Sequence, residues 1–100
     1  MKVGFHPAAS EELQAAAADY ERFREGLGAR LVYEVESMCG VLAEHPSYGR
    51  RVDGIHRQAP LRRFPFLLVY RHDAAAVLVV AVAHKRRRPR YWQSRVSGRR

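Results

Sequence analysis

The chain has 100 residues, 47% of them apolar, which gives it material for one modest hydrophobic core and excludes a disordered chain. Its longest apolar run, residues 74–83, is too short to cross a bilayer, which needs about 20 apolar residues. The formal net charge of +8 is unevenly spread, with a net of −4 over residues 1–44 and +12 over residues 45–100. An acidic half and a basic half indicate that the two halves have different duties, and that the basic half meets an anionic partner.

The N-terminal pattern predicts a short strand followed by a helix. Val3 and Phe5 alternate with polar neighbours over Lys2–Phe5, and Pro7 suits the first turn of a helix because it has no N–H to satisfy. Glu11 and Glu12 are placed early in that helix, where its dipole favours negative charge. Apolar residues then recur at three- and four-residue spacing up to the Gly-Leu-Gly sequence at 26–28, at Leu13, Ala16, Ala17, Tyr20 and Phe23.

A second helical pattern follows at once and ends at Pro46, because the residue before a proline avoids helical geometry. Its apolar residues are Leu31, Val35, Met38 and Leu42. Two helices joined by so short a linker are expected to pack as an antiparallel hairpin.

Beyond a polar loop at 46–54 the period changes from helical to extended. Residues 55–59 alternate, and residues 66–70 and 76–83 are continuous apolar strands joined by a turn at 72–75. We therefore predict one α+β domain over residues 1–100. It has a short N-terminal strand, an antiparallel helical hairpin packed on a mainly antiparallel sheet of three to four strands, and a short basic C-terminal helix or tail.

The segment from His84 to Arg95 holds six cationic side chains, a tyrosine and the only tryptophan. If the hairpin turns near residues 73–74, positions that add to about 147 face each other, which places His84 beside Arg63. Arg57 is expected in the same neighbourhood. Guanidinium groups bind phosphates or carboxylates, so this end of the sheet points to nucleic acid or to an acidic protein, although a charge run alone is often only a solvated tail.

The order of these elements resembles the RelE/ParE superfamily of toxins from bacterial type II toxin–antitoxin modules. The resemblance covers nearly the whole chain. Its motifs are Gly-Leu-Gly at 26–28, His-Pro at 45–46, Arg-Arg-Phe-Pro-Phe-Leu-Leu-Val-Tyr at 62–70 and Ala-Val-Ala-His-Lys-Arg-Arg-Arg-Pro-Arg-Tyr-Trp at 81–92.

The resemblance implies a small toxin, of the kind called a plasmid stabilisation protein, that is neutralised by a cognate acidic antitoxin. ParE-like members inhibit DNA gyrase, whereas RelE-like members cleave mRNA on the ribosome without a metal. A degenerate member without toxicity is a third alternative. On the cleavage alternative the implied catalytic residues are Arg63, His84, Arg86 and Tyr91, and the implied target-binding residues are Arg57, Arg62, Arg87, Arg88 and Trp92. The lysines that some nuclease members carry on the second strand are absent here. Arg57 and Arg62 occupy that region, and arginine is a poor general base.

Cofactors, metals and membranes are not expected. Cys39 is the only cysteine, so no disulfide or cysteine metal site forms within the chain, and His6, His45, His56 and His72 lack metal-ligand spacing. No signal-peptide pattern follows Lys2, so we expect a cytoplasmic protein. Trp92 is expected to pack its indole over the open face of the sheet, with stacking on a base as the alternative.

Overall fold

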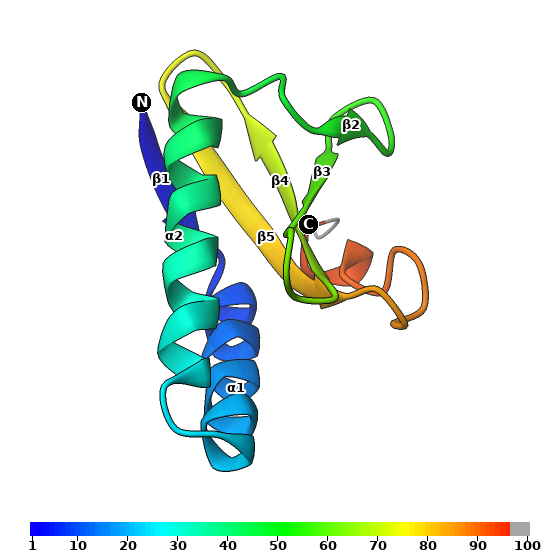
Figure 1. The fold of residues 1–100 in the computed structure, drawn as a ribbon. Coiled ribbons are helices and arrows are strands. Elements are labelled where there is room, and N and C mark those ends of the chain that lie inside the picture. The colour runs from blue at the N-terminus through cyan, green and yellow to red at the C-terminus, as the bar shows by residue number, and fades with distance from the viewer. Residues whose placement is uncertain (97–100) are drawn as a thin grey trace.

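In the computed structural model, which describes residues 1–96, a helical hairpin lies against one face of a five-stranded sheet (Figure 1). The strand order is β1-β5-β4-β3-β2. The helices and strands are β1 (Lys2–Phe5), α1 (Pro7–Phe23), α2 (Leu27–Glu44), β2 (Arg50–Arg51), β3 (Arg57–Pro60), β4 (Phe66–His72), β5 (Ala76–His84) and the 3₁₀ helix η1 (Gln93–Arg95). Within residues 1–96, no helix has the length and apolar character needed to span a membrane.

The helical hairpin begins and turns where the sequence predicts. The His6 ring accepts a hydrogen bond from the Ala8 N–H at 3.0 Å, and Pro7 occupies the first helical turn. At the turn, Gly26 has a φ of 88°, a left-handed conformation that side chains with a Cβ adopt at a cost. A Cβ on Gly28 would collide with the Ala17 carbonyl oxygen of α1, so this glycine lets the two helices approach closely.

The main core lies between the helical hairpin and the sheet. From α2 it takes Leu31, Val35 and Leu42, all with no exposed surface. From β4 it takes Phe66, Leu68 and Tyr70, which alternate with residues of the other face. Tyr70 also ties down the loop before β2, because its hydroxyl donates to the Pro46 carbonyl at 2.6 Å and accepts from the Gly49 N–H at 2.9 Å.

The predicted α+β class and mainly antiparallel sheet are confirmed, with one strand more than the three to four expected. β1 joins the sheet edge parallel to β5, and the remaining pairs are antiparallel. The unexpected strand is β2, two exposed arginines inside the segment predicted to be a loop. A two-residue polar strand has no hydrophobic alternation, so the sequence pattern could not reveal it.

The predicted pairing of His84 with Arg63 was wrong, because His84 pairs with Phe66. The β4–β5 turn is displaced from the expected position, since the Asp73 carboxylate accepts from the N–H groups of Ala75 and Ala76 and holds the turn there. A bulge at Val69/Tyr70 adds a further shift in register. Arg57 pairs with Tyr70, at the other end of β4 from Phe66, so it does not share the neighbourhood of His84.

A smaller apolar cluster covers the opposite face of the sheet. Trp92 packs there on Val69, Val80, Ala81 and Ala83, and only 3% of its surface is exposed. The expectation that the indole covers the open face is therefore confirmed. The predicted C-terminal helix is the single turn η1.

Candidate functional site

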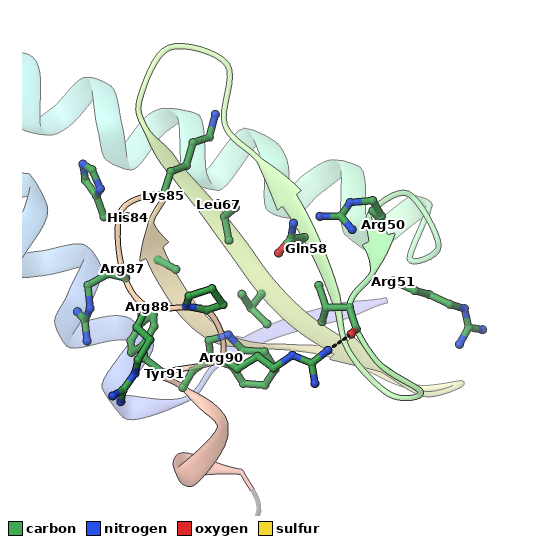
Figure 2. A pocket seen from close by; sticks show the side chains of 15 residues that line it. Arg50, Arg51, Gln58, Leu67, His84, Lys85, Arg87, Arg88, Arg90 and Tyr91 are labelled. Atoms are coloured by element: carbon green, nitrogen blue, oxygen red, sulfur yellow. Dashed lines mark hydrogen bonds between the residues drawn. The ribbon is translucent and has the colours of Figure 1, made fainter.

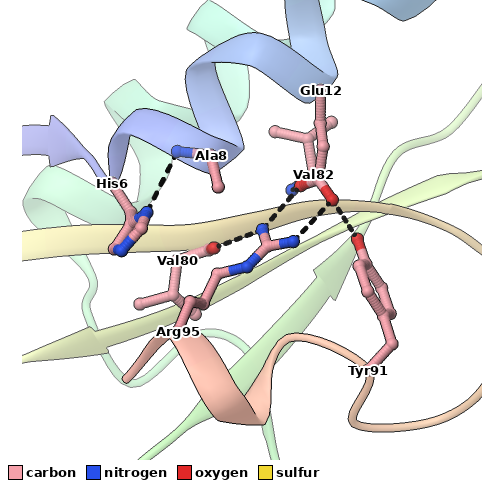
Figure 3. A network of polar contacts seen from close by, with 7 residues as sticks. All are labelled: His6, Ala8, Glu12, Val80, Val82, Tyr91 and Arg95. Carbon is pink, nitrogen blue, oxygen red and sulfur yellow. Dashed lines mark hydrogen bonds and ion pairs between the residues drawn. The ribbon is translucent and has the colours of Figure 1, made fainter. Parts of the chain in front are cut away.

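The C-terminal segment is fastened to the body of the protein by one carboxylate, Glu12 of α1 (Figure 3). The Arg95 guanidinium donates to both Glu12 oxygens, at 3.0 and 3.1 Å, and the Tyr91 hydroxyl donates to Oε2 at 2.7 Å. Such two-point arginine–carboxylate pairs fix orientation as well as distance. Glu12 lies in the second turn of α1, beyond the reach of the helix dipole that the sequence suggested for it.

The same network completes the edge of β5. β1 covers that edge only as far as the Phe5–Val79 pair. Beyond it, Glu12 Oε1 accepts from the Val82 N–H at 3.0 Å, and Arg95 donates to the Val80 carbonyl at 3.1 Å. Two side chains thus take the place of a neighbouring strand and satisfy edge groups that would otherwise stay open.

The network also shifts the pKa values of its acidic members. Burial alone would raise the pKa of Glu12, but hydrogen bonds from Arg95, Tyr91 and the Val82 N–H outweigh it, and the pKa lies below its ordinary value of 4.5. Burial and the hydrogen bond to the Glu12 carboxylate raise the pKa of Tyr91 above its ordinary value. At neutral pH Glu12 is therefore a carboxylate, and Tyr91 keeps its proton.

Residues of the β2–β3 turn hold the segment from its other side. The His56 ring lies 4.7 Å from the Trp92 indole, measured between ring centres, and His56 Nδ1 contacts the Asp53 carboxylate at 3.1 Å. The Arg90 guanidinium donates to the Val52 carbonyl at 2.7 Å. Arg90 has a φ of 64°, a strained value for a residue with a side chain, which marks the tight turn that brings Trp92 back onto the sheet.

Between these two supports lies a hollow of about 390 Å³, which we call the basic hollow (Figure 2). Its floor is formed by β3, β4 and β5, through Gln58, Leu67, Val69, Ala83 and the strand end at His84. One wall is Arg50, Arg51 and Val52, and the other is the segment Lys85 and Arg87–Trp92. Six cationic side chains and no carboxylate line it: Arg50, Arg51, Lys85, Arg87, Arg88 and Arg90.

These six cations lack ion-pair partners in the described part of the chain. The ion pairs of residues 1–96 join Arg22 to Asp19, His56 to Asp53 and Arg95 to Glu12, all outside this group. Uncompensated like charges around one hollow repel each other and attract anions. The hollow is therefore suited to an anionic partner.

The structure separates the four residues that the resemblance implied to be catalytic. His84 and Tyr91 line the basic hollow, whereas Arg63 lines another hollow against α2 and Arg86 lines neither of these two. The N–H groups of Arg62 and Arg63 both donate to Glu34 Oε1, at 2.8 and 2.9 Å, which holds their loop against that helix. The contact with Glu34 of α2 thus keeps Arg63 away from the basic hollow.

His84 and Tyr91, the two implied catalytic residues that could transfer protons, already make hydrogen bonds within the protein. His84 Nδ1 accepts from the Arg86 N–H at 3.0 Å, so in the neutral ring the proton sits on Nε2, which then donates and cannot accept. The Tyr91 hydroxyl donates to Glu12, and the Arg87 guanidinium covers the Tyr91 ring at 3.8 Å from its centre. In this arrangement neither group is free to act as a base.

The predicted target-binding residues are also divided. Arg87, Arg88 and Trp92 line the basic hollow, although only 3% of the Trp92 surface is exposed. Arg57 lies elsewhere, and its guanidinium donates to the Gly49 carbonyl at 2.8 Å. The sequence analysis missed Arg50, Arg51, Lys85 and Arg90, and the anchoring role of Glu12. Lys85 and Arg90 lie within the basic run at 84–95, so the sequence could have identified them. No sequence signal links Arg50 or Glu12 to that run.

Within residues 1–96, no group of three or more His, Cys, Asp or Glu side chains is arranged so that it could hold a metal ion.

The comparisons with known proteins agree with this fold. Residues 3–89 match the family described as "ParE toxin of type II toxin-antitoxin system, parDE". A solved structure described as "Chromosomal ParDE TA system from P. aeruginosa" superposes with a TM-score of 0.73, at 16% sequence identity, over 84% of this chain and 95% of that chain. No curated protein sequence was found to match.

The fold of this chain is thus seen again in a solved structure of a toxin–antitoxin system. Because the family match spans most of its length, the chain belongs to the ParE toxins of type II toxin–antitoxin systems.

Proposed function

We propose that this ParE-family toxin arrests growth by inhibiting DNA gyrase, and that it acts through the face of the sheet that carries the basic hollow. The observation that carries the proposal is the meeting of cations from two separate segments, Arg50–Arg51 and Lys85–Arg90, around one hollow without a carboxylate. Gyrase works on DNA, so a cationic face is suited to the enzyme while it holds its substrate.

The state of His84 and Tyr91 supports inhibition by binding over RNA cleavage. Metal-free cleavage needs a group that takes a proton from the attacking hydroxyl and another that gives one to the leaving group. In the neutral His84 ring, Nε2 is a donor and not the acceptor that a general base needs, and the Tyr91 hydroxyl donates its proton to Glu12. Arg63, which would stabilise the reacting phosphate, lies against α2 in a different hollow.

A cognate acidic antitoxin is the second part of the proposal. The net charge of +8 favours a partner of opposite sign, and membership of a toxin–antitoxin family provides one. The solved relative is itself described as a ParDE system. We place the toxin in the cytoplasm, where both gyrase and nascent antitoxin are found.

The test is a supercoiling assay with purified gyrase, relaxed plasmid and the purified chain, beside a ribosome-dependent mRNA cleavage assay. We expect supercoiling to be inhibited and mRNA to stay intact, with His84→Ala as active as the wild type. Prior addition of the antitoxin should restore supercoiling. Cleaved mRNA that disappears with His84→Ala would instead establish the ribonuclease alternative, and failure in both assays would identify a degenerate, non-toxic member.

A further inference from the structure

We infer that the basic hollow is a binding site for the phosphate backbone of double-stranded DNA. The inference rests on the proposed action on gyrase and makes it more specific: the toxin contacts the DNA that the enzyme holds. It is a statement about the six cations named above, four of which sequence reasoning did not select.

The cations are arranged as two walls around a groove rather than as a single patch. Figure 2 shows Arg50 and Arg51 on one side of Gln58 and Leu67, and Arg87 and Arg88 on the other. The Arg90 side chain extends from the second wall to the Val52 carbonyl of the first. A backbone strand of a duplex is a ridge of phosphates, so it can be contacted from both sides at once. Arginine is well suited to such contacts, because its planar guanidinium binds phosphate oxygens through two N–H groups.

The aromatic rings at this site are not exposed for stacking, which favours double-stranded over single-stranded DNA as the ligand. Proteins that bind single strands stack successive bases on exposed aromatic rings. Here only 3% of the Trp92 surface is exposed, and the Tyr91 ring is covered by the Arg87 guanidinium. Duplex DNA keeps its bases stacked internally and offers phosphates, which need only charge and N–H donors.

The same floor disfavours an acidic protein segment as the occupant. Protein interfaces depend on aromatic or aliphatic anchors that insert into pockets or are inserted by the partner. Three apolar residues of the hollow, Val69, Ala83 and Trp92, are already buried within the small cluster under it. Two more, Val52 and Leu67, are partly buried against the same cluster, which leaves charge as the main attraction. Attraction through charge alone is the mode of sequence-independent DNA binding.

The test measures binding of the full chain to a fluorescent 20-base-pair duplex by anisotropy over a series of salt concentrations. For the five cations that make no side-chain hydrogen bond to the described protein, we expect log K to fall with log salt at a slope of about −4 to −5. Arg50→Gln with Arg88→Gln removes one cation from each wall. It should reduce the slope by about 2 and weaken binding about tenfold or more.

Arg24→Gln with Arg30→Gln is the matched control, because it removes the same charge from the exposed surface of the helical hairpin. We expect this variant to bind the duplex within about twofold of the wild type. Circular dichroism of both variants checks that they fold. Equal losses in the two variants would show that net charge alone attracts DNA, and that the hollow is not a site.

Two further probes decide the class of ligand. A single strand or an RNA of the same sequence that binds more tightly than the duplex overturns the inference. So does poly-glutamate that outcompetes the duplex and loses this advantage in Arg50→Gln/Arg88→Gln, because the hollow is then a protein-docking site. If gyrase is inhibited while no duplex binding is seen at low salt, the DNA inference fails and the proposed function stands. If the duplex is bound and gyrase is unaffected, the proposed function fails instead.

Discussion

The two faces of the sheet are covered by different means. On one face, the helical hairpin buries a continuous apolar core that includes Leu31, Val35 and Leu42. On the other, a short C-terminal segment is held by one indole, Trp92, and by polar bonds to Glu12. The helical hairpin that covers the first face belongs to the acidic part of the chain, and the segment that covers the second face belongs to the basic part.

The comparison teaches where binding energy is available. Apolar packing satisfies the helix-covered face, whereas the cations on the other face have no ion-pair partner within residues 1–96 and repel one another. A surface that carries unrelieved repulsion gains most from an anionic partner. This difference supports the proposal that the open face is the acting face and the helical face its support.

The largest expected effect comes from removing the indole that covers the open face. Trp92→Ala should lower the free energy of unfolding by about 3–5 kcal/mol, as for other buried tryptophans. Urea denaturation measures it, with Tyr33→Ala as the control, because that ring is 71% exposed and its loss should cost less than about 0.5 kcal/mol. A loss below about 1 kcal/mol for Trp92→Ala would mean that the segment is not fixed to the sheet in solution.

Removing the carboxylate that fastens the segment should have the next largest effect. Glu12→Ala leaves the Arg95 guanidinium, the Tyr91 hydroxyl and the Val82 N–H without their acceptor. We expect a loss of about 2–3 kcal/mol, because unpaired groups at a partly buried site retain their desolvation cost. The same urea titration applies, with Glu11→Ala, on the neighbouring exposed position, as the control. Equal stability of the two variants would contradict an anchoring role.

Tyr91→Phe separates anchoring from catalysis. It removes one hydrogen bond to Glu12 and should lower stability by about 1 kcal/mol. Under the proposed function, we expect Tyr91→Phe expressed without antitoxin to arrest growth as the wild type does, at confirmed protein levels. Loss of the arrest in a folded Tyr91→Phe protein would restore the tyrosine to a chemical role.

A smaller effect is expected from pH. The folded-state pKa of Glu12 lies below its ordinary value of 4.5, so its carboxylate contributes stability that is complete above 4.5 and disappears as pH falls through the lower, folded-state pKa. The difference in unfolding free energy between the wild type and Glu12→Gln should therefore shrink on acidification. A difference that stays constant or widens below 4.5 would show that Glu12 is not ionised in the folded protein.

Hydrophobic periodicity predicted the helices, β4 and β5 closely, because those elements bury whole faces and their apolar residues must recur at fixed intervals. Hydrophobic periodicity could not predict the register between β4 and β5. A turn held by the Asp73 carboxylate and a bulge at Val69/Tyr70 each displace the pairing, and neither leaves a mark in the apolar pattern.

For a related reason, the sequence predicted only one of the two walls of the candidate site. The cationic run after β5 is visible as composition, so Arg87 and Arg88 were found. The opposite wall, Arg50 and Arg51, comes from a polar loop and becomes part of the site only when β2 pairs with β3. The partners of Glu12, Tyr91 and Arg95, lie 79 and 83 positions further along the chain. Over such a separation a single sequence carries no signal that two residues are in contact.

The central claim, that the basic face is the acting surface, is tested most directly by gyrase supercoiling with three proteins: the wild type, Arg50→Gln/Arg88→Gln and Arg24→Gln/Arg30→Gln. We expect the wild type and the helical-hairpin variant to inhibit equally, and the basic-hollow variant to need about tenfold more protein for the same inhibition. Equal inhibition by all three folded proteins would contradict the claim and move the acting surface away from the hollow.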